Sequence, residues 1–204
     1  MKAFRHGRVI RFQGKSRLKP TLIIVSAPSG AGKSTLCAKL VEDYNEIIEN
    51  VSFTTRPPRN QEQDGVDYFF IDKAEFEEKT GRDFFVESAL VHGNYYGVSQ
   101  AQIDTAIGAG RPIILDIDVQ GARTLIHKYP DALTIFVMPP SIDELKRRLQ
   151  GRDQGKTHNY ELRIRNAEQE MDEARLFKHK IVNDDLEKAY SELKKIVETD
   201  LGNH

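Results

Sequence analysis

Short apolar runs alternate along this chain with longer segments of helical periodicity. The apolar runs are built mainly from aliphatic and aromatic residues, as buried strands are, and lie at 22–25, 113–117, 134–138 and 181–183. Helical patterns begin after the first run, from Gly32, and recur near 118–128, 141–150, 159–178 and 185–198. Strands that alternate with helices predict an α/β fold, with a parallel sheet covered by helices on both faces.

Two stretches break this alternation. Residues 51–97 hold short aromatic-rich segments separated by turn signals such as Pro57-Pro58 and Asp64-Gly65, which predict a small β-rich lobe inserted into the α/β core. A second irregular stretch, 150–159, carries two glycines between two predicted helices. We expect it to be a mobile lid.

The composition excludes several classes of protein. With 204 residues, 39% of them hydrophobic and 30% charged, the chain suits one domain with a buried core and is not a wholly disordered polypeptide. No apolar run approaches the length of a membrane-spanning helix. A single cysteine, Cys37, excludes an intramolecular disulfide framework and a cysteine-rich zinc module, and the six histidines lack the spacing of a zinc site on one helix.

Residues 1–20 form a basic arm. They hold seven Lys or Arg side chains and no acid, so the rest of the chain has 23 basic against 31 acidic residues, although the net charge is −1. Such an arm could bind nucleic acid or an anionic surface, but it has little to pack and no recognition motif, and we expect a disordered terminus. It lacks the apolar stretch of a secretory signal, and a transit peptide is the weaker alternative. We therefore expect a cytoplasmic protein.

A phosphate-binding motif opens the first helix. Its residues are Ala27, Pro28, Ser29, Gly30, Ala31, Gly32, Lys33, Ser34 and Thr35. They fit the pattern G-x-x-x-x-G-K-[ST] except that Ala27 replaces the first glycine. The glycines let backbone N–H groups face an anion, and the helix N-terminus adds its partial positive charge. Lys33 can reach the β- and γ-phosphates and Ser34 can ligate Mg²⁺, so the motif predicts a nucleoside triphosphate site on a P-loop NTPase-type sheet.

The predicted lobe holds residues suited to a phosphate acceptor. Arg56 and Arg59 lie three positions apart, separated by two prolines, and such a stiff pair can hold a dianionic phosphate. In isolation, arginines at this spacing are more often solvated charges. The end of the second apolar run adds Asp116 and Asp118, where ligands bind in parallel sheets. Asp116 is placed either to orient a metal-bound water or to cap the strand end.

Together these motifs resemble guanylate kinase. The resemblance is collinear from about Leu22 to Lys195 and rests on four motifs besides the phosphate loop: Thr54-Thr55-Arg56-Pro57-Pro58-Arg59, Gly93-Asn94-Tyr95-Tyr96-Gly97, Leu115-Asp116-Ile117-Asp118-Val119-Gln120-Gly121 and Ile181-Val182-Asn183-Asp184-Asp185. It implies transfer of the γ-phosphoryl of ATP to GMP with Mg²⁺, giving ADP and GDP, in guanine nucleotide metabolism. It also implies a core (21–50, 98–145 and 165–204), a GMP-binding lobe (51–97) and a helical lid (about 146–164), with no stable nucleic acid partner and no membrane.

The resemblance also implies a role for individual positions. Arg56, Arg59, Tyr68 and Tyr96 would hold the GMP phosphate, whereas Ser52 and Glu87 would read guanine with Asp118 close by. Arg148, Arg152 and Arg163 would converge on the phosphates with Lys33 and Arg56, and Asn183 would lie near the adenine. Ser34 would bind Mg²⁺ directly and Asp116 through water.

This chemistry needs no general base. The second pKa of a phosphate monoester is about 6, so the attacking phosphate of GMP is already largely dianionic near neutral pH. Catalysis then rests on alignment and charge neutralisation. Glu87 suits the guanine site because one carboxylate can accept hydrogen bonds from N1–H and from the 2-amino group, whereas adenine presents an unprotonated N1.

Val98 departs from the resemblance. It stands where the family usually has Ser or Thr, a hydroxyl placed to contact guanine. We therefore expect somewhat weaker guanine binding but retained specificity, since Glu87 and Ser52 are present.

Two other functions are weighed against a guanylate kinase. The first is a kinase of the same architecture that accepts another nucleoside monophosphate, against which Glu87 argues. The second is a non-catalytic interaction domain that uses the monophosphate lobe to bind partners; such modules typically have a degraded phosphate loop, whereas Lys33 is intact here.

Overall fold

The structure is a computed structural model. It describes residues 2–5, 8–11, 18–59, 61–91, 93–153 and 160–202, and, within these, the side chains of 18–59, 61–91, 93–150 and 164–202.

The core is a five-stranded parallel sheet, which confirms the predicted α/β fold. Its strand order is β11-β10-β3-β9-β4, and every neighbouring pair runs parallel. The strands are β3 (Leu22–Ser26), β4 (Ile48–Glu49), β9 (Ile113–Asp116), β10 (Leu133–Met138) and β11 (His179–Val182). All four predicted runs therefore form strands, and β3 lies in the middle with both faces covered.

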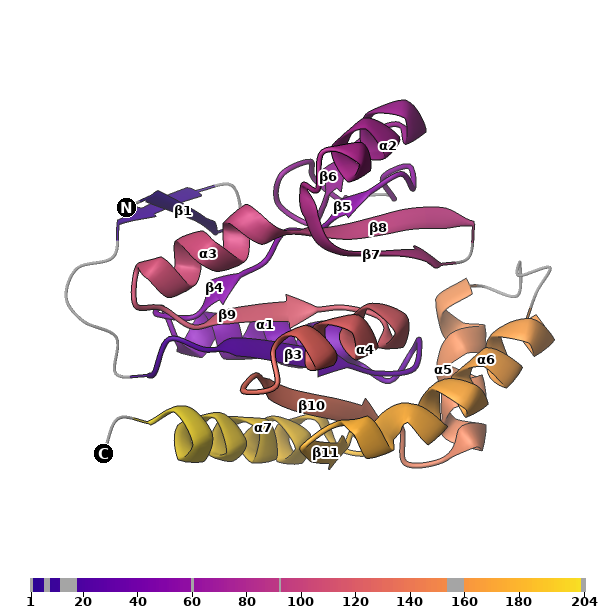
Figure 1. Ribbon diagram of the computed structural model, residues 1–204. Coiled ribbons are helices and arrows are strands. Elements are labelled where there is room, and N and C mark those ends of the chain that lie inside the picture. Colours follow the sequence, from indigo (N-terminus) through magenta and orange to yellow (C-terminus); the bar gives the residue numbers. More distant parts are fainter. Residues whose placement is uncertain are drawn as a thin grey trace.

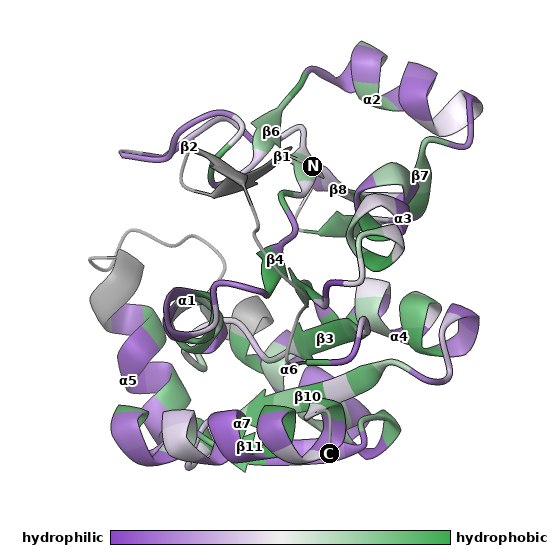
Figure 2. Cartoon of the chain, turned by 90° about the vertical axis from the view of Figure 1, so that its left-hand side faces the viewer, coloured by the Kyte–Doolittle hydropathy of each residue, from purple (hydrophilic) through white to green (hydrophobic). Residues whose placement is uncertain are grey.

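Helices cover both faces of this sheet (Figure 1). The helices of the core are α1 (Lys33–Asp43), α3 (Gln100–Gly108), α4 (Val119–Lys128) and α7 (Leu186–Leu201), with a 3₁₀ turn at Glu173–Leu176. Side chains alternate across a strand, so Ile23 and Val25 of β3 pack with α1 and α7, whereas Leu22 and Ile24 pack with α3 and α4. Figure 2 shows the hydrophobic residues gathered on β3 and β10, with the hydrophilic side of α7 turned outward.

The lobe is a second, four-stranded sheet of order β6-β5-β8-β7. Its strands are β5 (Phe53–Thr54), β6 (Phe69–Phe70), β7 (Phe85–Val91) and β8 (Asn94–Ser99). The lobe, predicted to be β-rich, also contains a helix, α2 (Lys73–Gly81), which was not predicted. Phe76 is its one buried residue and stacks on Phe85 with ring centroids 4.5 Å apart; a single apolar position leaves no helical periodicity to detect.

The predicted lid consists mostly of two helices, α5 (Ile142–Asp153) and α6 (Tyr160–Asp172). The prediction of an irregular stretch from residue 150 is wrong for 150–153, which continue α5, and 154–159 lie outside the described residues. The two helices share a small apolar cluster, made by Leu145, Leu149, Ile164 and Ala167.

The N-terminal arm differs from the disordered terminus expected. Strands β1 (Lys2–Arg5) and β2 (Arg8–Arg11) pair as an antiparallel hairpin. The core also begins earlier than residue 21, because Leu18 is buried and the N–H of Lys19 donates to the carbonyl of Leu201 at 2.7 Å. Within the described residues, no helix is long and apolar enough to cross a membrane.

Candidate active site

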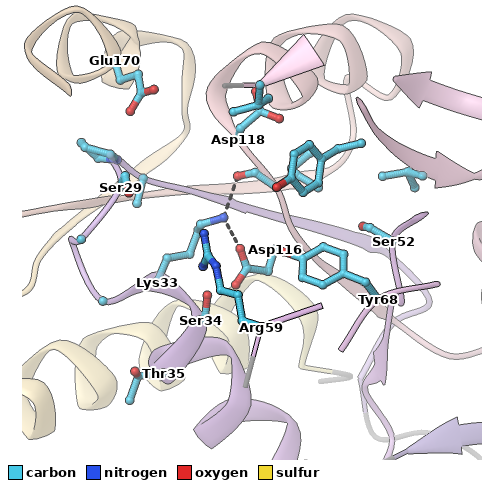
Figure 3. A pocket seen from close by; sticks show the side chains of 18 of the residues that line it. Ser29, Lys33, Ser34, Thr35, Ser52, Arg59, Tyr68, Asp116, Asp118 and Glu170 are labelled. Atoms are coloured by element: carbon cyan, nitrogen blue, oxygen red, sulfur yellow. Dashed lines mark hydrogen bonds and ion pairs between the residues drawn. The ribbon is translucent and has the colours of Figure 1, made fainter. Parts of the chain in front are cut away.

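A cleft of about 560 Å³ lies where the carboxyl ends of β3 and β9 meet the lobe, the edge at which parallel sheets bind ligands. Its volume suits a small organic ligand. The lining comes from the phosphate loop, the lobe, the β9–α4 junction, α5 and α6 (Figure 3). It comprises Ala27, Pro28, Ser29, Gly30, Gly32, Lys33, Ser34, Thr35, Ser52, Arg59, Tyr68, Val91, Tyr96, Gly97, Val98, Asp116, Ile117, Asp118, Arg148 and Glu170.

The phosphate loop presents an uncapped helix end to this cleft. Gly30 and Gly32 have φ of +92° and +89°, a region that glycine adopts without strain. Gly32 is the N-cap of α1 and gives no side-chain cap, so the first N–H groups of the helix are available to an anion. All the predicted loop residues line the cleft except Ala31, which is buried behind it.

Asn183 supports the loop from beneath. Its side chain is buried, and Nδ2 donates to the carbonyl of Ala31 at 2.7 Å. A Cβ at Gly32 would stand 2.3 Å from that nitrogen, so the loop approaches Asn183 closely only because residue 32 is glycine. Asn183 is absent from the lining of the cleft, and the adenine contact expected of it stays a prediction.

Lys33 is paired at the edge of the sheet. Its Nζ forms an ion pair with Oδ1 of Asp116 and donates to the carbonyl of Ile117 at 2.8 Å, as Figure 3 shows. Asp116 ends β9, the strand next to β3, which brings this carboxylate to the phosphate loop. Lys33, Asp116 and Ser34 thus line one cleft.

The two arginines of the lobe have different surroundings. Arg59 lines the cleft, whereas Arg56 does not. Both terminal nitrogens of Arg56 donate to Glu62 at 2.9 Å, and its Nε donates to the hydroxyl of Tyr96 at 3.2 Å. Glu62 also accepts the N–H of Arg59 at 2.7 Å. Sequence reasoning missed Glu62, although an acid three residues after Arg59 was a visible signal.

Two tyrosines complete this wall. Tyr68 and Tyr96 line the cleft with ring centroids 5.9 Å apart in an edge-on arrangement. Burial, with a smaller contribution from Asp116, raises the pKa of Tyr68 to about 12. Its hydroxyl therefore stays protonated near neutral pH and can donate to a phosphate oxygen.

Glu87 holds a buried carboxylate with unused hydrogen-bonding capacity. The residue is 6% exposed, and its Oε1 has no hydrogen-bond partner among the described residues. Burial, and then the charge of Asp118, raises its pKa to about 8. Asp118 caps α4, since its Oδ1 accepts the N–H of Gln120 at 2.7 Å. Ser52, also buried, accepts a hydrogen bond from Asn50 at 2.9 Å.

Arg148 brings a cation from α5 to the same cleft. Its Nε donates to Glu144 at 2.7 Å and its Nη2 to the carbonyl of Asn183 at 3.0 Å. The side chains of Arg152 and Arg163, also predicted to serve the phosphates, lie outside the described residues.

Comparison with known proteins identifies the family. A family model described as guanylate kinase matches residues 19–200. This chain belongs to the guanylate kinase family. It is 49% identical over 181 residues to a guanylate kinase of Bdellovibrio bacteriovorus, covering 89% of this chain and 98% of that one. It is 47% identical over 176 residues to one of Legionella pneumophila, covering 86% and 84%.

A solved structure agrees with this assignment. The crystal structure of guanylate kinase from Anaplasma phagocytophilum superposes with a TM-score of 0.76 at 30% identity, covering 91% of this chain and 88% of that chain. The P-loop fold expected from the sequence is therefore confirmed. Guanylate kinases phosphorylate GMP with ATP to give GDP, so ATP and GMP are the two substrates of this family's reaction.

One further acid of the cleft was not predicted. Glu170 lies on α6, half-buried, beside Ser29 of the phosphate loop (Figure 3). It lies in a helix whose apolar periodicity carried the sequence prediction, and no motif marked it out.

Proposed function

We propose that this chain is an active guanylate kinase that transfers the γ-phosphoryl of ATP to the 5′-phosphate of GMP, giving ADP and GDP. One observation carries the proposal: the phosphate loop opens onto a cleft that Val98 also lines, and Val98 pairs across the lobe sheet with Glu87, a buried carboxylate whose Oε1 has no hydrogen-bond partner among the described residues. The loop suits a triphosphate, and the unpaired carboxylate suits the two donors of guanine.

The ATP half of the cleft is the loop 27–32 with the first turn of α1. Backbone N–H groups there would bind the phosphate oxygens, and Lys33 would leave Asp116 to reach the β- and γ-phosphates. Release of Lys33 replaces one anionic partner by another, so its charge stays balanced when the triphosphate binds.

The side chains at this edge also fit Mg²⁺. The Ser34 hydroxyl and the Asp116 carboxylate offer the oxygen ligands that this ion prefers, with Ser34 binding directly and Asp116 through water. No cluster of three acidic, histidine or cysteine ligands exists among the described residues, so the ion would arrive with the ATP phosphates. Bound there, it would neutralise charge between the β- and γ-phosphates.

The GMP half is formed by the lobe. Arg59, Tyr68 and Tyr96 would hold the phosphate. Arg56 would join them when its guanidinium leaves Glu62 and pairs with the GMP phosphate instead. Glu87 and Ser52 would read the guanine, with Asp118 at the edge of the base. A carboxylate that accepts from guanine leaves a lone pair facing N1 of adenine, which discriminates against AMP.

Catalysis would rest on alignment and charge. Movement of the lobe (51–97) and the lid (146–164) toward the core (21–50, 98–145 and 165–204) would place the two phosphates in line and exclude water. Arg148, together with Arg152 and Arg163 of the lid, would neutralise charge on the transferring group. We propose the cytoplasm as the site of action.

Product analysis tests this proposal. The protein is incubated with ATP, Mg²⁺ and GMP, and the nucleotides are separated by chromatography. Equal amounts of ADP and GDP are expected, and Lys33→Ala should lower the rate at least about 100-fold because charge stabilisation is lost. ADP formed without GDP would contradict phosphoryl transfer to GMP.

A further inference from the structure

Glu170 contacts the phosphate loop from the lid side. It lies near the end of α6, and its carboxylate accepts a hydrogen bond from the backbone N–H of Ser29. In Figure 3 it projects from its helix toward Ser29, apart from Lys33 and Asp116. The contact joins the helix that leaves the lid to the start of the loop that would bind ATP.

The loop is thereby supported at two points. Asn183 donates to the carbonyl of Ala31 at 2.7 Å, and Glu170 accepts from the N–H of Ser29. Gly30, which has a positive φ, lies in the sequence between Ser29 and Ala31. Because glycine adopts many conformations, bonds on either side of it fix the direction of the loop N–H groups.

The position of this acid needs a reason, because a carboxylate beside a triphosphate repels it. Burial and the charge of Asp118 raise the pKa of Glu170 to about 7, while the Ser29 N–H and Lys33 act in the opposite direction. Charge attraction to phosphate cannot explain an acid here. The hydrogen bond that Glu170 accepts from the N–H of Ser29 does explain its presence.

We propose that Glu170 is a positioning residue for ATP, which fixes the phosphate loop by accepting the N–H of Ser29. This inference rests on the proposed function, but it concerns the ATP half of the cleft alone. The carboxyl oxygen matters as an acceptor, so an amide at the same place should serve almost as well.

Three variants test the proposal: Glu170→Ala, Glu170→Gln and, as a matched control, Glu168→Ala, which removes an exposed acid from the same helix. We would measure kcat, the KM values for ATP and GMP, and ATP binding by calorimetry without GMP. Glu170→Ala should weaken ATP binding and raise the KM for ATP about fivefold to tenfold, the effect of one lost hydrogen bond. The KM for GMP should stay within about twofold. Glu170→Gln should restore ATP binding to within about twofold of wild type, and Glu168→Ala should leave it unchanged.

Other results would overturn the proposal. If Glu170→Ala and Glu170→Gln both tighten ATP binding, the residue acts by repulsion. If the two weaken binding equally, or neither changes it, the acceptor role is wrong. Thermal unfolding of each variant separates these effects from loss of folding. A wild-type protein that binds ATP without phosphorylating GMP would contradict the proposed function, while the binding data would still decide the role of Glu170.

Discussion

Among single residues, Glu87 is the acid whose ionisation the fold changes most clearly within the site. Burial and Asp118 raise its pKa from 4.5 to about 8. Between these two values the folded protein holds a proton that the unfolded chain has released. The contribution of Glu87 to the free energy of unfolding therefore falls as the pH rises through this window.

Guanine binding should show the opposite dependence on pH. The N1–H and 2-amino groups of guanine donate hydrogen bonds, so GMP favours the ionised carboxylate. We expect the KM for GMP, measured at saturating ATP, to fall as the pH rises from about 6.5 toward the Glu87 pKa of about 8. Glu87→Gln should raise this KM at least about tenfold and remove the component of the pH dependence that belongs to Glu87. Equal pH profiles for the two proteins would contradict the assignment.

Val98 offers a second test at this scale. It is buried, lines the cleft and lies opposite Glu87 in the β7–β8 pairing. Val98→Thr keeps the side-chain shape and replaces one methyl group by a hydroxyl that can contact guanine, so we expect a lower KM for GMP. The free energy of unfolding should fall by about 1–3 kcal/mol, because the hydroxyl is buried in the absence of substrate. An unchanged or higher KM for GMP would refute the role given to this position.

At the scale of elements, α4 and β7 approach each other through a glycine. A Cβ at Gly121 of α4 would stand 2.8 Å from the carboxyl carbon of Glu87. The close contact of α4 with β7 therefore positions the Glu87 carboxylate, and it depends on the absence of a side chain at Gly121. Asp118 caps the same helix, so the start of α4 organises both acids that we assign to the guanine site.

Gly121→Ala should displace the Glu87 carboxylate. We expect the KM for GMP to rise at least about tenfold, the KM for ATP to stay unchanged, and the free energy of unfolding to fall by about 1–3 kcal/mol through overpacking. Gly108→Ala in α3 is the matched control, because a Cβ there meets nothing within 4 Å. If both substitutions have the same effect on GMP kinetics, the close approach does not position Glu87.

Among the strands of the core sheet, those with long apolar runs were predicted directly from the sequence. The runs that form β3 and β10 are almost wholly apolar because helices cover both sides of the sheet. Helix α2 escaped prediction because only Phe76 is buried. The continuation of α5 to Asp153 escaped it because Gly151 lowers helix propensity locally.

For the whole molecule, the residues that the sequence motifs singled out lie close together, while the roles given to them stay predictions. The phosphate loop and the aromatic and basic residues of the lobe follow one another at fixed spacing, and most of them line one cleft. Contacts across long sequence distances were beyond such reasoning. The bond from Asn183 to Ala31 joins residues 152 positions apart, and the pairing of Ser29 with Glu170 depends on how α6 returns to the core.

The two proposed substrate halves belong to different parts of the molecule. The loop for ATP belongs to the core sheet, whereas Arg59, Tyr68 and Tyr96 belong to the lobe. Under the proposed function, specificity for the acceptor resides in the lobe, to which Glu87 also belongs. Phosphate transfer requires both parts to face the same cleft.

The most direct test of this account is a coupled assay for ADP production with ATP and Mg²⁺, in which GMP, AMP, UMP and dTMP are compared as acceptors. The account predicts turnover with GMP at least about 1,000-fold above the other three, in line with a polar site that rejects a mismatched base, and loss of that turnover in Lys33→Ala. Equal or faster turnover with another monophosphate, or none with any acceptor in a folded protein that binds GMP, would contradict it.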